Sequence, residues 1–121
     1  MIGRKHRFHG RNSLRAVYTK GVTVRNNYCA LRVLPVKQGK PYRVAVVVSK
    51  KVSKSAVVRN RIRRRIYELV RANAGDVFSA DIVITVFSDQ LASLPASELE
   101  KQLQEMLAQV DNTTRPQSKQ E

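Results

Sequence analysis

The sequence predicts one two-layer α+β domain, in which helices pack on a single β-sheet. The chain has 121 residues, of which 42% are hydrophobic, and this is enough for one modest core. Its apolar spacing gives the element order helix, strands, helix, strand, helix, and no linker or internal repeat divides the chain. The strands on either side of the central helix also permit a parallel β-α-β unit.

The first expected element is a short helix over residues 13–20. Leu14, Val17 and Tyr18 follow the i, i+3, i+4 spacing of one helix face, and Gly21 suits a C-terminal stop. Residues 1–10 before this helix are basic and lack periodicity, so we expect a flexible arm there.

Extended chain is expected over residues 22–35 and 42–49. In the first stretch, alternation places Tyr28, Ala30 and Arg32 on one face. The second stretch is rich in valine, which is typical of a buried strand. A turn-forming segment separates the two stretches, which could therefore form a hairpin.

The clearest helix is expected over residues 55–73, because its apolar residues form one stripe along the helix. This stripe consists of Val58, Ile62, Ile66, Leu69 and Val70. A strand over residues 81–87 and a last amphipathic helix over residues 96–110 follow.

These elements set the expected boundaries of the domain. We expect a single folded domain over residues 11–110, because the last apolar helix position is Val110. The polar residues 111–121 lack an apolar face, so we expect a disordered tail there.

Charge is distributed very unevenly along the chain. The 23 Lys and Arg outnumber the 9 Asp and Glu, which gives a formal net charge of +14. Of these, 20 Lys and Arg but only one acid lie between the first residue and Ala74. A polyanionic partner is therefore expected, either nucleic acid or an acidic membrane surface, and it should contact the first three fifths of the chain.

Cysteine content and apolar runs indicate a soluble cytoplasmic protein. Cys29 is the only cysteine, so no internal disulfide can form, and its position in extended chain suggests a buried thiol. The longest apolar runs have about five residues, far fewer than a membrane span needs. The basic start of the chain lacks the apolar core of a signal peptide.

The helix expected over residues 55–73 carries six arginines and a single acid, Glu68. Helical geometry places Asn60, Arg64, Tyr67 and Arg71 opposite the apolar stripe. The remaining basic residues flank this row or precede the helix: Lys50, Lys51, Lys54, Arg59, Arg61, Arg63 and Arg65. Such faces usually mix signs, and guanidinium groups can grip phosphates with two hydrogen bonds, so we expect this helix to bind RNA.

The stretch Arg59-Asn60-Arg61-Ile62-Arg63-Arg64, which follows a valine-rich strand and Ser49-Lys50-Lys51, resembles the signature helix of the bacterial ribonuclease P protein family. The segment from Leu14 to Tyr28 is similar to that family's first helix and first strands. The resemblance covers residues 4–110. The family often has aromatic residues where Leu14 and Cys29 stand, and an arginine where Tyr67 stands, and Arg65 is an added charge.

The resemblance implies a fold and a function. The implied fold has the order αβββαβα and a four-stranded mixed sheet with a left-handed β-α-β crossover, as in a known ribosomal protein domain. From the residues alone we would expect a right-handed crossover, since about 98% are right-handed. The implied function is that of the protein subunit of ribonuclease P, which assists a catalytic RNA in removing the 5′ leader of precursor tRNA.

Two RNA-binding surfaces follow from the resemblance. The arginine helix and the lysines before it would bind the RNA subunit. A groove between the first helix and the sheet would bind the precursor tRNA leader, and its expected residues are Leu14, Tyr18, Tyr28, Ala30 and Arg32. A shallow surface with a few aromatic rings and cations suits single-stranded RNA of varied sequence.

We expect no catalytic residue, metal site or small-molecule cofactor in the polypeptide. His6 and His9 have no carboxylate or cysteine nearby, so phosphate contact or solvent exposure explains them better than metal binding. Acids that could hold catalytic magnesium are missing from the basic region, and Mg²⁺ would be held by the RNA subunit. Turn chemistry and helix or strand termination account for Asp76, Asp81 and Asp89.

Two alternatives fit the same charge and size. A ribosomal protein or general RNA chaperone would bind many RNAs without preferring a precursor that carries its leader. A cationic protein of the membrane surface is the other, but the arginine helix has a weak membrane face, because Tyr67 is its only aromatic residue.

Overall fold

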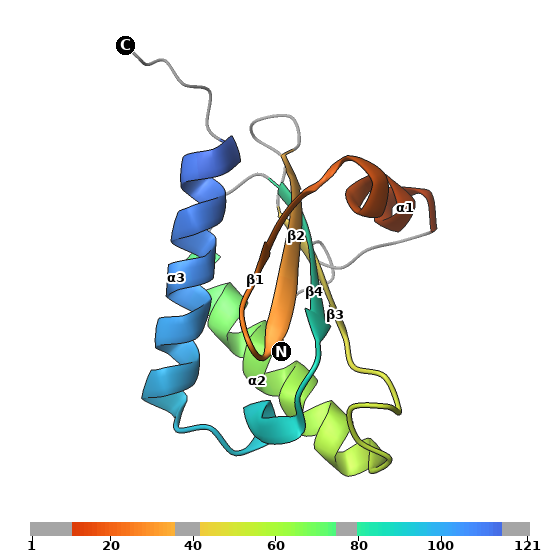
Figure 1. Cartoon of the computed structure of the whole chain (residues 1–121), viewed down its shortest axis with the longest axis vertical. Helices are drawn as coiled ribbons and strands as arrows, with labels where there is room; N and C mark the ends of the chain where they lie inside the picture. The colour runs from red at the N-terminus through yellow and green to blue at the C-terminus, as the bar shows by residue number, and fades with distance from the viewer. Residues whose placement is uncertain (1–10, 36–41, 75–79, 115–121) are drawn as a thin grey trace.

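The computed structural model describes residues 11–35, 42–74 and 80–114, and the expected basic arm 1–10 lies outside this range. The helices and strands lie in an order that matches the expected αβββαβα, with one additional 3₁₀ turn (Figure 1). They are α1 (Arg11–Lys20), β1 (Val22–Arg25), β2 (Cys29–Pro35), β3 (Arg43–Val47), α2 (Ala56–Ala74), β4 (Ala80–Val86), η2 (Asp89–Ala92) and α3 (Ala96–Thr114).

The four strands form one mixed sheet in the order β1-β2-β4-β3. β1 pairs antiparallel with β2, β2 pairs antiparallel with β4, and β3 pairs parallel with β4. The expected hairpin between residues 22–35 and 42–49 is therefore wrong, because β4 lies between β2 and β3. The hairpin forms instead within residues 22–35, which divide into β1 and β2.

Asn26 explains why residues 22–35 form two strands. Its side-chain oxygen accepts hydrogen bonds from the backbone N–H groups of Tyr28 (2.8 Å) and Cys29 (3.0 Å). Its own backbone N–H donates to the Cys29 carbonyl at 2.9 Å. An asparagine side chain that mimics a backbone turn in this way reverses the chain direction.

The β3-α2-β4 unit is parallel, and Figure 1 shows that its crossover is left-handed. This is the rare hand expected from the family resemblance, whereas the residue pattern alone favoured the right-handed form. α2 and α3 pack on one face of the sheet, and α1 contacts β2 and β4 on the other (Figure 1). The two main layers are thus the sheet and the α2/α3 pair, with partial cover from α1.

The main core lies between the sheet and the α2/α3 pair. Alternate strand residues such as Leu31, Ile82 and Ile84 are at most 1% exposed and point toward the two helices. Ile62 and Val70 of α2 are fully buried against them, which confirms the apolar stripe expected for this helix. Burial of these side chains is the main term that holds α2 in place.

α2 begins at the position that its capping residue sets. The hydroxyl of Ser55 accepts a hydrogen bond from the backbone N–H of Val58 at 3.3 Å, as an N-cap residue does. The Ser55 carbonyl accepts the first helical bond from Arg59 at 3.1 Å. The observed helix Ala56–Ala74 therefore agrees within one residue with the expected helix 55–73.

Gly21 joins α1 to the sheet at a point with no space for a side chain. A Cβ atom at this position would lie 2.5 Å from the Val17 carbonyl oxygen and 3.1 Å from the Val33 carbonyl oxygen. The side chain of Val17, which belongs to α1, is fully buried. The glycine thus ends α1 and allows it to approach β2 closely.

α3 is longer than expected. It continues to Thr114, so the expected helix end at residue 110 is wrong, while the domain boundary and the disordered tail stay predictions. The sequence Asp111-Asn112-Thr113-Thr114 has low helix propensity, but it extends a helix that tertiary contacts with α2 and β1 already hold. The rest of the expected tail, residues 115–121, lies outside the described residues.

Candidate RNA interface

The outer side of α2 displays a row of cations. Asn60, Arg61, Arg64 and Arg71 are exposed, as the helical spacing predicted. Arg59 and Arg63 are partly exposed, and the Arg63 guanidinium donates a hydrogen bond to the Asn60 side chain. The buried stripe holds α2 against the sheet, so the side chains of the outward row face solvent along the length of the helix.

Three lysines extend the cationic surface at the N-terminal end of α2. Lys50, Lys51 and Lys54 are all exposed in the segment between β3 and α2. A turn closed by the Val52 N–H and the Ser49 carbonyl (3.1 Å) holds this segment next to the helix start. The free N–H groups of the first helical turn add partial positive charge there.

Arg65 of the predicted interface makes contacts within the protein that the sequence did not indicate. Its guanidinium donates hydrogen bonds to the Leu91 carbonyl (2.8 Å) and to the Leu94 carbonyl. Leu91 lies in η2, and Leu94 lies in the segment that joins η2 to α3. The Arg65 side chain therefore links α2 to η2 and to the segment after it, and two of its N–H donors bond within the protein.

Tyr67 is a correction, because its ring lies toward the sheet and not in the outward row. The Tyr67 hydroxyl accepts a hydrogen bond from the backbone N–H of Val46 at 3.3 Å, and the ring packs against the core. β3 is an edge strand, so this hydroxyl satisfies a backbone donor that the sheet leaves unpaired. A helical wheel could not show this, because Tyr67 is long enough to reach back around the helix.

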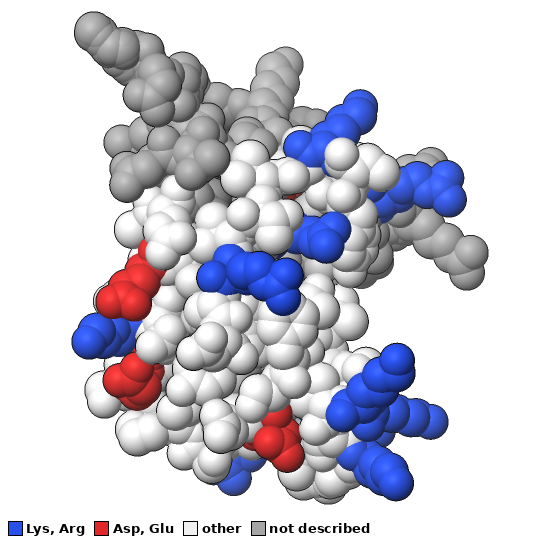
Figure 2. Space-filling model, in the orientation of Figure 1, with Lys and Arg blue, Asp and Glu red and all other residues white. Residues whose placement is uncertain are grey.

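The charges near α2 do not balance one another. Glu68 is the single acid of the helix, and it accepts hydrogen bonds from Arg71 at 2.8 and 3.1 Å. The other arginines in the outward row have no described acid opposite them. On the face seen in Figure 2, most basic side chains lie over α1, the sheet and the region of the α2 start, and the acidic side chains lie mainly over α3 and η2, with one basic group among them.

A second group of candidate residues lies between α1 and the sheet. Tyr18 of α1 is 43% exposed, and the guanidinium of Arg32 on β2 lies 5.0 Å from the centre of its ring. Arg32 also donates a 3.5 Å hydrogen bond to the Tyr18 carbonyl. Ala30 lies two residues before Arg32 on the same face of β2 and is 5% exposed. Leu14 lies in α1, but its side chain is outside the described part of the structure.

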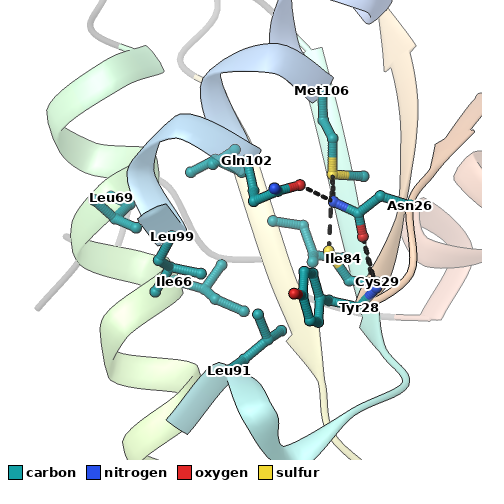
Figure 3. A pocket seen from close by; sticks show the side chains of 11 residues that line it. Asn26, Tyr28, Cys29, Ile66, Leu69, Ile84, Leu91, Leu99, Gln102 and Met106 are labelled. Atoms are coloured by element: carbon teal, nitrogen blue, oxygen red, sulfur yellow. Dashed lines mark hydrogen bonds between the residues drawn. The ribbon is translucent and has the colours of Figure 1, made fainter. Parts of the chain in front are cut away.

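Tyr28 does not belong to this surface, which corrects the prediction. The strand begins only at Cys29, and the bend before it turns the Tyr28 ring to the opposite face (Figure 3). There the ring lines a small apolar cavity of about 20 Å³ between the sheet and the α2/α3 pair. This cavity is too small for a nucleotide, so Tyr28 has a packing role.

The predicted burial of Cys29 is confirmed, and the same cavity explains its chemistry. The Cys29 thiol is buried and donates a hydrogen bond to the Met106 sulfur at 3.8 Å (Figure 3). Burial raises the pKa of this thiol to about 11, because the apolar surroundings disfavour the thiolate. The thiol is therefore protonated and unreactive at neutral pH.

Sequence reasoning missed three functional or structural residues on the α1 side of the sheet. Phe87 is 43% exposed, and the Arg25 guanidinium lies 5.1 Å from the centre of its ring. Asp81 is 3% exposed and accepts hydrogen bonds from Arg43 at 2.8 and 2.7 Å, so it is a buried ion-pair partner and not a turn residue. The sequence signal for Arg25 was alternation with the apolar Val24.

The described residues show neither a metal-binding cluster nor a membrane-spanning helix. Among the residues that the structure describes, no group of three or more His, Cys, Asp or Glu side chains could hold a metal ion. His6 and His9 lie outside that range. None of the described helices is both long and apolar enough to cross a membrane.

The fold and the charged surface define a small basic α+β protein built around an exposed arginine helix. Comparison with known proteins identifies its family. Residues 2–111 match the family model Ribonuclease P. The chain is 36% identical over 110 residues to a ribonuclease P protein component of a Pseudanabaena species, covering 89% of this chain and 93% of that protein. A second such component, from Symbiobacterium thermophilum, is 31% identical over 84% of this chain and 87% of its own.

Solved structures share the fold. The ribonuclease P protein of Staphylococcus aureus aligns with a TM-score of 0.72 at 23% identity, over 87% of this chain and 96% of that one. The protein of Thermotoga maritima aligns with a TM-score of 0.71 at 24% identity, over 86% and 96%. The chain belongs to the ribonuclease P protein family, and the expectation drawn from the motif Arg59–Arg64 is confirmed.

Proposed function

We propose that this protein is the RNA-binding subunit of ribonuclease P and assists the catalytic RNA in the endonucleolytic removal of the 5′ leader from precursor tRNA. Its relatives are named ribonuclease P protein components. The observation that carries the proposal is the outward row of α2, in which Arg61 and Arg64 are exposed, whereas Ile62 and Val70 of the apolar stripe are fully buried.

The α2 row and the lysines before it are proposed to bind the ribonuclease P RNA. Like charges spaced along one helix repel one another, and phosphates that neutralise them remove this cost. Arginine suits the task because its planar fork can hold two phosphate oxygens at once. The proposed contacts are Lys50, Lys51, Lys54, Arg59, Asn60, Arg61, Arg63, Arg64 and Arg71.

The face between α1 and the sheet is proposed to bind the precursor tRNA leader. Tyr18 offers an exposed ring on which a base can stack, and Arg32 beside it offers a cation for the phosphate. Ala30, on the same face of β2, adds only a small, buried side chain to this surface. Contacts to ring faces and phosphates tolerate varied leader sequences.

The hydrolysis itself is assigned to the RNA subunit, which would also hold the Mg²⁺ ions. The acids nearest to the basic surfaces are already engaged within the protein, Glu68 by Arg71 and Asp81 by Arg43. The polypeptide is proposed to act without a cofactor of its own, in the cytoplasm where precursor tRNA is processed. Its contribution would be to screen phosphate repulsion and to extend the substrate contact into the leader.

Reconstitution tests the proposal directly. The purified protein alone should leave a precursor tRNA intact, and the protein with ribonuclease P RNA should remove the leader at low salt and low Mg²⁺, where the RNA alone is slow. Inactivity of the mixture would contradict the proposal. Equal binding to unrelated RNAs, with no preference for a precursor that carries its leader, would instead indicate a general RNA chaperone.

A further inference from the structure

We infer that Arg25 and Phe87 form a second stacking site for single-stranded RNA, which binds a leader nucleotide next to the one at Tyr18 and Arg32. The inference rests on the proposed function of the α1 side of the sheet and extends it to residues that the family motif does not include. It starts from the two arginine–aromatic pairs in the described structure, whose rings are each 43% exposed.

Strand register places the two pairs on the same face of the sheet. Arg25 of β1 lies opposite Ala30 of β2, and Arg32 lies two residues further along β2. Directly opposite residues of antiparallel strands point to the same side, as do residues two apart. Arg25, Ala30 and Arg32 therefore share the face that α1 partly covers, and the buried Val24 and Leu31 point to the other.

Phe87 is exposed on this face because of the bend at Tyr28. The Phe87 N–H donates to the Tyr28 carbonyl at 2.7 Å, so the pairing of β2 with β4 continues one step beyond the strands. In regular strand geometry the Tyr28 side chain would lie beside Phe87. Because the Tyr28 ring turns into the core instead, it leaves the Phe87 ring open to solvent and accessible to Arg25.

The spacing of the pairs suits neighbouring nucleotides. Two residues along a strand span about 7 Å, and the next strand lies about 5 Å away. Between the pairs the sheet carries the small side chains of Ala30 and Thr85, its neighbour on β4. An extended single strand can therefore cross the sheet with one base at each ring and one phosphate at each guanidinium.

Packing alone gives Phe87 no role comparable to that of Tyr28. Phe87 and Tyr18 are each 43% exposed, whereas most other large apolar side chains of the described residues are buried or half-buried. The exposed part of each ring is available to a base, and the arginine beside the ring supplies a cation for the adjoining phosphate. Each pair thus combines the two chemical groups that single-stranded RNA requires.

The test combines protein variants with single abasic nucleotides in the leader. Holoenzyme is reconstituted with ribonuclease P RNA, and binding of precursor tRNA is measured with an abasic nucleotide placed at each leader position in turn. Phe87→Leu keeps an apolar side chain without a ring, and Phe87→Tyr restores the ring. Lys101→Ala removes an exposed cation from α3 and is the matched control for Arg25→Ala.

Phe87→Leu and Arg25→Ala should each weaken binding of the intact leader roughly 5-fold or more, the scale of one lost base stack. One abasic position should cancel the Phe87→Leu effect, and an adjacent position should cancel the effect of Tyr18→Ala. Phe87→Tyr and Lys101→Ala should bind as the unchanged protein does. A merely structural role of Phe87 would not couple to any leader position.

Two results separate this inference from the proposed function. If Tyr18→Ala couples to a leader position and Phe87→Leu couples to none, the second site does not exist and the leader groove remains. If neither variant couples to the leader, the proposed leader-binding face itself is wrong. Thermal melts of each variant show whether it remains folded. If Phe87→Leu does not fold, Phe87→Tyr is compared with the unchanged protein instead.

Discussion

Replacing Arg65 and Arg64 by alanine should separate two roles that look identical in the sequence. Arg65 donates to the Leu91 and Leu94 carbonyls, whereas Arg64, the preceding residue, is exposed on the outward row of α2. Arg65→Ala should therefore reduce stability, and Arg64→Ala should reduce RNA affinity.

The expected magnitude follows from the Arg65 contacts. A hydrogen bond from a charged donor contributes about 1.5–3 kcal/mol, and two of them, discounted for the partial exposure of the side chain, give about 2–4 kcal/mol. For a chain of this length this corresponds to roughly 8–16 °C in melting temperature. Arg64→Ala should change stability by less than about 0.5 kcal/mol, as is usual for a surface substitution.

Thermal melts and RNA binding at several salt concentrations measure both effects. Arg64→Ala should lower the slope of log affinity against log salt by about one unit, because one phosphate contact is lost. Arg65→Ala, measured well below its melting temperature, should leave that slope unchanged, and Lys101→Ala is the control. The reasoning is refuted if Arg65→Ala melts normally and lowers the slope as Arg64→Ala does.

Three further predictions concern the leader surface, the core and the buried ion pair. Tyr18→Ala should raise the KM for precursors with long leaders more than for those with one nucleotide; an equal effect in steady-state kinetics would assign Tyr18 to packing. The unfolding free energy should fall by roughly 2–3 kcal/mol from pH 9 to 11, because the unfolded chain loses the Cys29 proton from a thiol of pKa 9.0 while the folded chain, at about 11, keeps it. In denaturant titrations, Cys29→Ala should lack this pH-dependent loss of unfolding free energy. The same pH profile for Cys29→Ala and for the unchanged protein would contradict the prediction. Arg43→Ala should destabilise the fold by about 3 kcal/mol in the same titrations, since it leaves the buried carboxylate of Asp81 unpaired, and a loss below about 1 kcal/mol would show that water replaces the arginine.

The fold could be predicted from the sequence wherever one periodicity dominated a segment. The stripe from Val58 to Val70 fixed the central helix to within one residue, since only one helix face could be buried. Strand partners were harder to predict, because the valine-rich segment that became β3 fits β2 or β4 equally well by composition. The pairing with β4 depends on the crossover through α2, which is a property of the whole chain.

The residues of the candidate site also differ in how well the sequence could place them. Arg61, Arg64 and Arg71 could be placed on the outer surface because helical geometry fixes their direction. Arg65 and Tyr67 could not, since long side chains at the flank of a helix can turn either outward or toward a neighbouring element. Their partners, η2 and the edge of β3, are brought next to α2 only by folding.

By itself the sequence determined what the protein is and where its charge lies, because composition, helix periodicity and the motif Arg59–Arg64 are local properties of the chain. The tertiary structure alone decided which polar groups are free to bind a partner. It turned Tyr28 into the core and brought Arg25 over Phe87, because a single bend at Asn26 breaks the strand alternation on which the sequence reading relied.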